Sequence, residues 1–263
     1  MKIEGQATLV TGAGSGLGAE TARELARRGA QVALLDINLD AARRVADEIT
    51  QAGGQALAVA CDITSTESAE AALQAAAKAH GPARLMMNIA GIGTARRLVG
   101  KDGTPMPLEA FRRVVEVNLI GTFNMTRLAA AAMLKLAPVD DPHQTQERGV
   151  IVNTASVAAF DGQVGQEAYA ASKGGVVSLT LPLARDLAQF GVRVMTIAPG
   201  LFHTPLMDEL PQAVQDSLAA SIPFPKRLGR PEEFAQLAAS IVENTALNGE
   251  VIRLDGALRM AAR

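Results

Sequence analysis

The sequence of 263 residues is poor in the residue types that build disulfide frameworks and metal sites. Its single cysteine, Cys61, excludes an internal disulfide and a cysteine-based zinc ribbon. The three histidines, His80, His143 and His203, lie far apart in the chain, and none falls in an H-E-x-x-H pattern. We therefore expect no metal site, and the lack of disulfides suits a reducing compartment.

The sequence also lacks a surplus of positive charge and a long apolar run. The formal net charge is −2, so there is no basic excess of the kind that binds nucleic acid. No segment approaches the roughly 18 to 20 apolar residues that a membrane span needs. The first residues lead almost directly into a strand-like run, so we expect no signal or transit peptide. These absences predict a cytoplasmic protein that binds neither nucleic acid nor a membrane.

Short apolar segments alternate with longer amphipathic segments along the whole chain. The expected strands cover 7–10, 31–35, 56–60, 85–88, 150–154, 192–197 and 250–254. The expected helices cover 17–28, 40–52, 66–79, 108–136, 166–189 and 231–243. Such alternation is typical of a parallel sheet with helices on both faces. No linker or low-complexity segment divides the chain, so we expect residues 1–263 to form a single α/β domain of the doubly wound Rossmann type.

Two segments interrupt this alternation, at 93–107 and at 137–149. Both are longer than the usual connections between strands and helices, and long loops in compact domains are often functional. The first carries Arg96, Arg97 and Lys101.

A glycine-rich segment, Thr11–Gly18, follows the first expected strand and opens the first expected helix. Glycines let main-chain N–H groups approach a pyrophosphate, and the helix N-terminus adds partial positive charge. An ordinary tight turn would use similar glycines, but the second strand ends in Asp36, 18 residues after Gly18. In a Rossmann fold a carboxylate near this position binds the adenosine ribose and repels a 2′-phosphate. We therefore predict NAD, not NADP, as the cofactor.

Asp62, which follows the third expected strand, is a second candidate for a contact with the adenosine end of the cofactor. A helix or turn cap would use the same residue. Competing phosphate-binding and hydrolase motifs, G-x-x-x-x-G-K-[ST] and G-x-S-x-G, do not occur.

Four polar side chains that follow the fourth expected strand suggest a site for alcohol oxidation. Tyr169, the only tyrosine, precedes Lys173 by four residues, which puts both side chains on one face of a helix. Ser156 follows the fifth expected strand, and Asn118 lies within a long expected helix. Each residue alone has an ordinary structural explanation as a cap, kink or surface side chain. Their order after a cofactor loop favours a catalytic group.

The chemistry assigns a role to each of these four side chains. Tyrosine has a pKa near 10, and nearby positive charge favours the phenolate, so we expect Lys173 to supply part of a lowering of the Tyr169 pKa and the positively charged nicotinamide to supply more. Tyr169 would then remove the proton of a secondary alcohol. Ser156 would hold the reacting oxygen, and Asn118 would interrupt its helix and hold a water molecule.

Together these motifs resemble the short-chain dehydrogenase/reductase superfamily. The resemblance runs from Gly5 to Asp255-Gly256 and includes Thr11–Gly18, Asp62, Asn88-Ile89-Ala90-Gly91, Asn118, Ser156, Tyr169-x-x-x-Lys173 and Pro199-Gly200. It implies a seven-stranded parallel sheet in the order 3-2-1-4-5-6-7 and a catalytic Ser-Tyr-Lys-Asn group. Ile89 departs from the common Asn-Asn-Ala-Gly motif and removes one polar side chain from the cofactor site.

The glycine loop and the resemblance together imply the site residues. We expect cofactor contacts from Gly12, Ser15, Gly16, Leu17, Gly18, Asp36, Asp62, Ile63, Asn88, Ile89, Ala90, Gly91, Tyr169, Lys173, Pro199, Gly200, Phe202 and Thr204. We expect substrate contacts from Ser156, Gln163, Tyr169 and Leu206, with the substrate loop and its helices at about 200–225.

Three longer segments, 153–166, 193–202 and 247–256, resemble one subgroup, the type 2 (short-chain) 3-hydroxyacyl-CoA dehydrogenases. This implies NAD-linked oxidation of (S)-3-hydroxyacyl-CoA to 3-oxoacyl-CoA and a homotetramer or homodimer. The subgroup is also known for activity on hydroxysteroids. The cations Arg96, Arg97 and Lys101 would meet the CoA phosphates, or they are solvated surface charges.

Three alternative functions stay open. One is an NAD-linked dehydrogenase of a hydroxysteroid or another hydrophobic secondary alcohol. Another is a 3-oxoacyl-carrier-protein reductase, although such enzymes usually use NADPH and Asp36 argues against that cofactor. The third is a non-enzymatic NAD-binding scaffold, which the presence of Ser156, Tyr169 and Lys173 disfavours.

Overall fold

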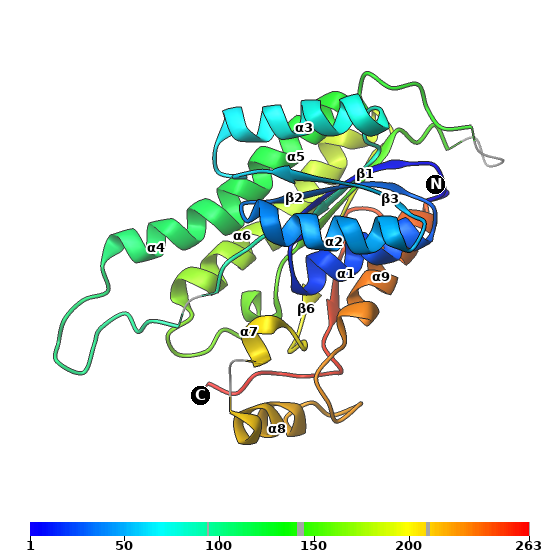
Figure 1. The fold of residues 1–263 in the computed structure, drawn as a ribbon. Coiled ribbons are helices and arrows are strands. Elements are labelled where there is room, and N and C mark those ends of the chain that lie inside the picture. The colour runs from blue at the N-terminus through cyan, green and yellow to red at the C-terminus, as the bar shows by residue number, and fades with distance from the viewer. Residues whose placement is uncertain (94, 141–144, 209–210, 263) are drawn as a thin grey trace.

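The computed structural model describes residues 1–93, 95–140, 145–208 and 211–262. In this part of the chain, seven parallel strands form one sheet in the order β3-β2-β1-β4-β5-β6-β7 (Figure 1). The strands are β1 (Ala7–Thr11), β2 (Gln31–Asp36), β3 (Gln55–Ala60), β4 (Leu85–Asn88), β5 (Gly149–Thr154), β6 (Val192–Pro199) and β7 (Val251–Leu254). The predicted fold class and strand order are confirmed.

Most strands are apolar on both sides because helices cover both faces of the sheet. Val10 and Met87 belong to one apolar core, whereas their chain neighbours Leu9 and Met86 belong to the other. Successive side chains of a strand point to opposite faces, so each buried strand contributes to both cores.

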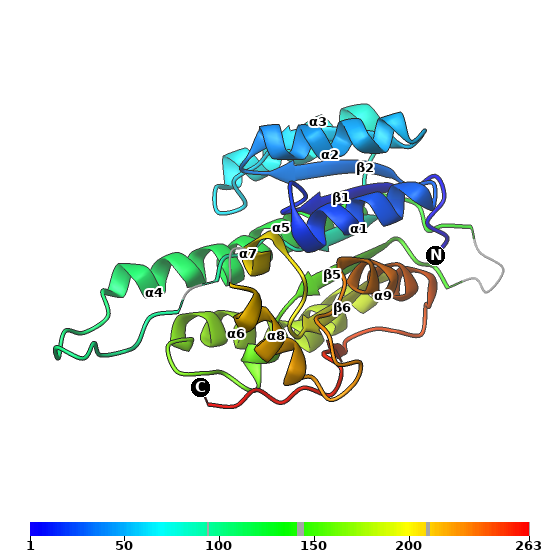
Figure 2. The same ribbon diagram turned by 60° about the horizontal axis from the view of Figure 1, so that its bottom comes forward.

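Two layers of helices enclose the sheet (Figures 1 and 2). One layer contains α1 (Gly16–Arg27), α2 (Leu39–Gln51) and α9 (Pro231–Glu243). The other contains α3 (Thr66–His80), α5 (Thr122–Met133) and α6 (Glu167–Ala188). The remaining helical segments are α4 (Leu108–Val115), η1 (Glu116–Gly121), η2 (Val157–Ala159), α7 (Pro205–Asp208) and α8 (Gln212–Ala220).

The helix expected over 108–136 is interrupted in the structure. A π-helical turn, η1, joins α4 to α5, and the helix ends at Met133. A π turn holds one residue more than an α-helical turn, and the apolar periodicity of the sequence does not reveal it. The other expected helices and the expected strands are found with ends shifted by at most two residues.

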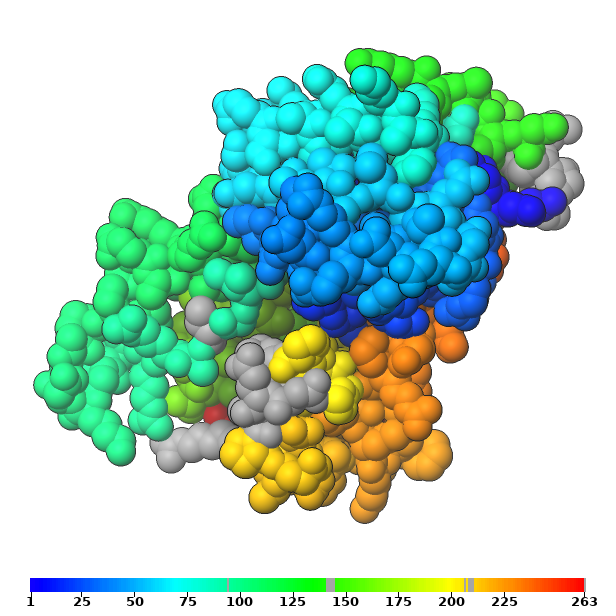
Figure 3. Space-filling model, viewed as in Figure 1, coloured from blue at the N-terminus to red at the C-terminus, as the bar shows by residue number. Residues whose placement is uncertain are grey.

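Residues 95–107 of the first long loop and helix α4 form an arm that projects from the body of the molecule (Figures 1 and 3). Within the loop, an antiparallel bridge pairs Val99 with Pro105. At the root of the arm, the N–H group of Arg96 donates a hydrogen bond to the carbonyl group of Gly165 at 2.8 Å. The arm is therefore attached beside the segment that leads into α6.

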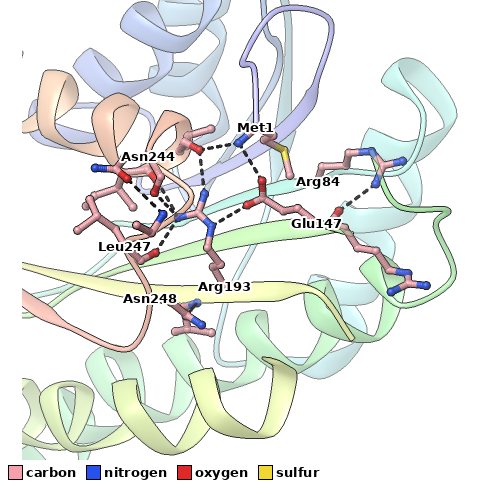
Figure 4. A network of polar contacts seen from close by, with 12 residues as sticks. Met1, Arg84, Glu147, Arg193, Asn244, Leu247 and Asn248 are labelled. Carbon is pink, nitrogen blue, oxygen red and sulfur yellow. Dashed lines mark hydrogen bonds and ion pairs between the residues drawn. The ribbon is translucent and has the colours of Figure 1, made fainter. Parts of the chain in front are cut away.

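The second long loop, at 137–149, precedes β5 at the amino-terminal edge of the sheet. Its Glu147 carboxylate is buried, and it binds the Arg193 guanidinium at 2.7 Å and the Met1 ammonium at 2.8 Å (Figure 4). Arg193 also donates hydrogen bonds to the main-chain carbonyl groups of Ile241, Val242, Asn244 and Leu247. The described part of this loop therefore fastens the N-terminus and β6 to the end of α9.

Across the described ranges, no helix combines the length and apolar character needed to cross a membrane. The same ranges hold no group of three or more His, Cys, Asp or Glu side chains placed to bind a metal ion.

Candidate active site

Two loops meet where the strand order reverses, between β1 and β4. Gly12 has a φ of +66°, and a Cβ atom on it would lie 2.8 Å from Cα of Ala90. A Cβ atom on Gly18 would overlap the carbonyl oxygen of Gly12. Only glycine fits these two positions, so the turn after β1 packs directly against α1 and against the loop after β4. Ligands of open parallel sheets bind in this crevice.

The hydroxyl group of Thr11 ties the same two loops together. Its Oγ1 atom accepts hydrogen bonds from the N–H groups of Ile89 at 3.0 Å and Ala90 at 3.2 Å. Thr11 was not among the predicted site residues, although it opens the glycine-rich motif. Its position there was the signal that could have identified it.

The Asp36 carboxylate stands at the carboxyl end of β2. One of its oxygens accepts a hydrogen bond from the N–H group of Gly14 at 2.9 Å, and the other accepts one from Asn38 at 2.8 Å. These two bonds fix a negative charge at the wall of the crevice, where a 2′-phosphate would be repelled.

A cavity of about 420 Å³ opens between these loops and α7. The predicted cofactor residues that line it are Gly12, Ser15, Gly16, Leu17, Gly18, Asp36, Asp62, Ile63, Ile89, Ala90, Gly91 and Thr204. Lining residues that the sequence analysis did not select are Leu35, Ile37, Cys61, Thr64, Ile92, Arg113, Val117 and Pro205.

Asp62 is both a wall of this cavity and a turn cap. Its Oδ1 atom accepts hydrogen bonds from the hydroxyl group of Thr64 at 2.7 Å and from its N–H group at 2.9 Å. These bonds lower the pKa of Asp62, and the positive charge of Arg113 acts in the same direction. The geometry allows both roles that the sequence left open. Arg113 comes from α4, far away in the chain, and nothing in the local sequence marks it.

Six predicted cofactor residues do not line the cavity, namely Asn88, Tyr169, Lys173, Pro199, Gly200 and Phe202. The Phe202 ring is buried and packs edge-to-face against Phe234, with ring centroids 6.4 Å apart. The Asn88 amide donates hydrogen bonds to Thr126 at 3.0 Å and to Asn153 at 2.8 Å. Any contact of Phe202 with a cofactor would therefore come from its main chain.

Lys173 lies next to this cavity and is 3% exposed. Its Nζ atom donates a hydrogen bond to the carbonyl oxygen of Thr154 at 2.8 Å, and a Cβ atom on Gly91 would lie 3.3 Å from Nζ. Burial lowers the pKa of Lys173 from 10.5 to about 8. Among the described residues, no carboxylate is paired with this ammonium, so the cation has one hydrogen bond from three possible donors.

Tyr169 and Ser156 lie together beside Lys173. The lysine Nζ atom is 5.9 Å from the centroid of the tyrosine ring. Ser156 precedes η2, and its Oγ atom accepts a hydrogen bond from the N–H group of Ala158 at 3.2 Å. The Ser156 side chain also acts on the Tyr169 phenol, whose pKa it lowers. Ser156 is therefore a helix cap and a partner of the phenol at the same time.

The pKa of Tyr169 is raised in the structure. Burial of the phenol raises this pKa, and the side chain of Ser156 opposes the rise with a smaller effect. The sequence analysis expected Lys173 and the positively charged nicotinamide together to lower this pKa, and that expectation stays a prediction, because loss of hydration disfavours the phenolate in the protein alone. A proton-accepting Tyr169 therefore needs more positive charge than the protein alone supplies.

Asn118 lies in the π turn η1, so the helix is interrupted where the sequence analysis expected it. Its side-chain oxygen accepts a hydrogen bond from the N–H group of Ile92 at 2.8 Å. Its amide donates to the carbonyl oxygen of Ile92 at 2.9 Å and to Oγ of Ser172 at 3.1 Å. Asn118 therefore holds the loop after β4 against α6, and the water molecule that it would hold stays a prediction.

The predicted substrate residues separate into two groups. Ser156 and Tyr169 lie together, whereas the Gln163 amide donates a hydrogen bond to the carbonyl group of Ala261 at 2.9 Å. The side chain of Leu206 lies outside the described part of the chain.

The three cations of the arm, Arg96, Arg97 and Lys101, are exposed. Within the described ranges, none of them forms an ion pair with a carboxylate. They are therefore available to an anionic ligand, as the sequence analysis proposed.

The cavity fits a nicotinamide dinucleotide. Its walls expose the main chain where Gly12 and Gly18 exclude side chains, as a pyrophosphate requires. At one end of the cavity, Asp36 offers a carboxylate to ribose hydroxyl groups. At the other end, Gly91 lies next to the Lys173 ammonium.

Comparisons with known proteins agree with this geometry. Residues 6–215 match the family model described as short chain dehydrogenase. The chain is 50% identical over 259 residues to 3-hydroxyacyl-CoA dehydrogenase type-2 of Drosophila melanogaster, with 98% of this chain and 99% of that protein covered.

Two solved structures are similar along almost the whole chain. The crystal structure of 3-hydroxyacyl-CoA dehydrogenase type-2 from Mycobacterium avium has a TM-score of 0.91 at 41% identity, with 98% of both chains covered. The crystal structure of 3-ketoacyl-(acyl-carrier-protein) reductase from Brucella melitensis complexed with NADH has a TM-score of 0.83 at 34% identity. It covers 98% of this chain and 100% of that one.

Proposed function

The chain belongs to the short chain dehydrogenase family, and from this premise we propose that it oxidises (S)-3-hydroxyacyl-CoA to 3-oxoacyl-CoA with NAD. Family membership confirms the predicted class, an oxidoreductase that acts on a CH–OH group with a nicotinamide cofactor. The observation that carries the reaction is the group formed by Ser156, Tyr169 and Lys173 beside the cavity. The substrate is supported by the 50% identity to a dehydrogenase of that name.

Asp36 supports NAD as the cofactor. Its carboxylate is held by Gly14 and Asn38 at the end of β2, which is where a ribose with a free 2′-hydroxyl group would donate to it. The residue that follows, Ile37, is exposed and brings no positive charge for a 2′-phosphate.

The protein's own groups would handle the proton of the alcohol. NAD⁺ held in the cavity would supply the hydride acceptor. Tyr169 takes the hydroxyl proton, and Ser156 holds the reacting oxygen by a hydrogen bond. Because burial raises the pKa of Tyr169, the phenol stays protonated until positive charge beside it stabilises the phenolate.

Lys173 and Asn118 would support this proton transfer to Tyr169. Two of the three N–H donors of Lys173 are not used by Thr154, and they can bind ribose hydroxyl groups and favour the phenolate. Asn118 keeps the loop after β4 at a fixed distance from α6, so Gly91 and Lys173 stay adjacent.

We also propose a homotetramer or homodimer in the cytoplasm. Three apolar side chains on the outer helices support the assembly, since Ile120, Phe123 and Leu181 are each more than two fifths exposed. Apolar side chains that are exposed in one protomer can be covered in an assembly.

The first test of the function is turnover. NAD⁺ reduction with (S)-3-hydroxybutyryl-CoA, followed by absorbance, is expected for the unmodified protein, and NADP⁺ is expected to be a poor replacement. In Tyr169→Phe we expect kcat to fall by at least about 10³-fold because the proton acceptor is lost. NADH binding by Tyr169→Phe, measured by fluorescence, is the control for folding.

Two outcomes would redirect the proposal. Turnover of hydroxysteroids or other hydrophobic alcohols without turnover of the CoA ester would favour the first alternative. NADH binding without turnover of any secondary alcohol would favour the scaffold.

The arm is the expected binding site for the CoA phosphates. The double variant Arg96→Ala/Lys101→Ala is expected to raise the KM of the acyl-CoA about tenfold, more at low salt, because charge-assisted contacts to phosphate are lost. The KM of a small secondary alcohol without CoA is expected to stay unchanged. Equal changes in both KM values would contradict a role in CoA binding.

A further inference from the structure

A cluster around Arg253 lies outside the catalytic group but contacts the segment that connects Ser156 to Tyr169. This segment, Phe160–Gln166, connects η2 to α6, and we call it the catalytic linker. The Arg253 guanidinium binds both oxygens of Asp161, at 2.6 and 3.3 Å, and its Nε atom donates to Asp255 at 2.7 Å. It also lies 5.1 Å from the centroid of the Phe160 ring. Arg253 thereby fastens the catalytic linker to the end of β7.

A second set of contacts extends this attachment along the chain after β7. Residues Ala257–Ala262, which we call the strap, run beside the catalytic linker and α8 (Figures 1 and 2). The Gln163 amide donates to the carbonyl group of Ala261 at 2.9 Å, and the N–H group of Val164 donates to Ala262 at 3.1 Å. The strap is therefore hydrogen-bonded to the linker at two successive residues.

Arg253 also binds the strap directly. A guanidinium N–H group of Arg253 donates to the carbonyl oxygen of Leu258 at 3.0 Å. The main chain of Met260 helps to lower the pKa of Asp161, although the contacts with Arg253 have the larger effect. One ion pair thus connects three segments: the catalytic linker, the end of β7 and the strap.

The other side of the strap is apolar and packs against the segment at 200–225. Leu258 is 2% exposed and is buried together with Ile222. Met260 packs against the same cluster, as do Met207 from α7 and Leu218 from α8. Because Thr204 and Pro205 at the start of α7 line the cofactor cavity, this cluster supports the α7 side of the cavity.

We propose that Arg253 is a positioning residue which, through the strap, fixes the distance between the catalytic linker and helices α7 and α8. The inference rests on the proposed function, since these segments would form two walls of the same alcohol-binding site. One wall begins at Ser156 and ends at Tyr169, so its placement sets where the reacting oxygen is held. The other carries apolar side chains that would contact the rest of the substrate. A fixed separation between the walls selects substrates by the bulk next to the alcohol carbon.

Two variants remove the attachment without changing the catalytic group. Arg253→Met keeps the apolar stem of the side chain, and Asp161→Asn keeps the shape of the carboxylate but not its charge. We expect both to raise the KM of the alcohol about tenfold and to lower kcat less, because the bidentate contact is charge-assisted. The Kd of NADH is expected to change by less than about twofold. Asp161→Glu, which keeps the charge, is expected to restore most of the loss.

A matched control and a double variant separate positioning from general stability. Arg28→Met removes an arginine that bridges α1 and α9 through Glu24 and Glu243, and it is expected to leave the KM of the alcohol unchanged. Met260→Ala weakens the apolar side of the strap. The combined variant Asp161→Asn/Met260→Ala is expected to raise KM by less than the product of the two single effects, because both act on one element.

Hydrogen exchange gives a readout that does not depend on the substrate. In Asp161→Asn we expect faster exchange in the catalytic linker and also in α8, which Asp161 does not touch. Faster exchange confined to the linker, or equal increases in the KM of the alcohol and the Kd of NADH, would overturn the proposal. Failure of the unmodified protein to oxidise the CoA ester would instead contradict the proposed substrate, and the exchange experiment would still decide on the strap.

Discussion

Two buried cations, Arg193 and Lys173, differ sharply in what surrounds them. The Arg193 guanidinium is paired with Glu147 at 2.7 Å and donates to four main-chain carbonyl groups at the end of α9. The Lys173 ammonium is as deeply buried, but it donates only to Thr154 within the described residues. The N–H donors of Arg193 are bound by other groups of the protein, whereas most N–H donors of Lys173 are left for a ligand.

The difference shows how burial alone fails to distinguish structure from function. A buried charge that is paired and hydrogen-bonded holds segments together, and removing one partner leaves the other uncompensated. A buried charge without a carboxylate partner costs stability, which is why burial lowers the pKa of Lys173 to about 8. Such a group is retained for what it binds, and perturbed pKa values gather at functional sites for this reason.

Replacing Lys173 is expected to separate activity from stability most strongly. In Lys173→Met we expect kcat/KM to fall by at least about 10³-fold, because the phenolate of Tyr169 loses its neighbouring charge. We expect the free energy of unfolding to stay unchanged or to increase, because a buried cation without a carboxylate partner is removed. Steady-state kinetics and urea unfolding measure the two quantities. A large loss of stability would show that Lys173, like Arg193, holds segments of the protein together.

Replacing Arg193 is expected to have the opposite pattern. In Arg193→Met we expect the free energy of unfolding to fall by about 3 to 5 kcal/mol, because Glu147 loses its guanidinium and four carbonyl groups lose a donor. The Kd of NADH at low temperature is expected to be unchanged. As a control, Arg23→Met removes an exposed pair with Glu48 and is expected to cost less than about 1 kcal/mol.

The pH dependence of stability gives a finer test of the same contrast. The pKa of Lys173 is about 8 in the folded protein and 10.5 as the ordinary value, so between these pH values the unfolded state binds more protons. Stability should therefore rise with pH in this window, relative to Lys173→Met, by up to roughly 3 kcal/mol, and it should be constant below it. Urea unfolding at about pH 7 and about pH 9.5 measures the difference. Parallel pH profiles of the two proteins would contradict an uncompensated Lys173.

The fold and the proximity of Tyr169 to Lys173 were predictable because local patterns determine them. Strands buried on both faces read as apolar runs, and Thr11–Gly18 combines a tight turn with a helix start. Tyr169 and Lys173 share a face of α6 because they are four residues apart, so their proximity follows from the helix alone.

Features that depend on contacts between distant segments were not predictable. Arg113 lines the cavity from α4, and Gln163 is bound by Ala261 although it lies between Ser156 and Tyr169 in the chain. The direction of the pKa shift of Tyr169 also depends on burial by many segments, whereas the sequence showed only its neighbour Lys173.

The π turn η1 adds one residue to a long helix without turning its two halves relative to each other. The extra residue is absorbed by the wider winding of the turn, so α4 and α5 keep nearly the relative rotation that one uninterrupted α-helix would give them. Deleting one of its six residues would therefore leave the direction of the arm and the buried face of α5, with Met125 and Ala129, almost unchanged. The deletion would instead disturb the placement of Asn118 against Ile92, so the turn separates the position of this one side chain from the position of the arm.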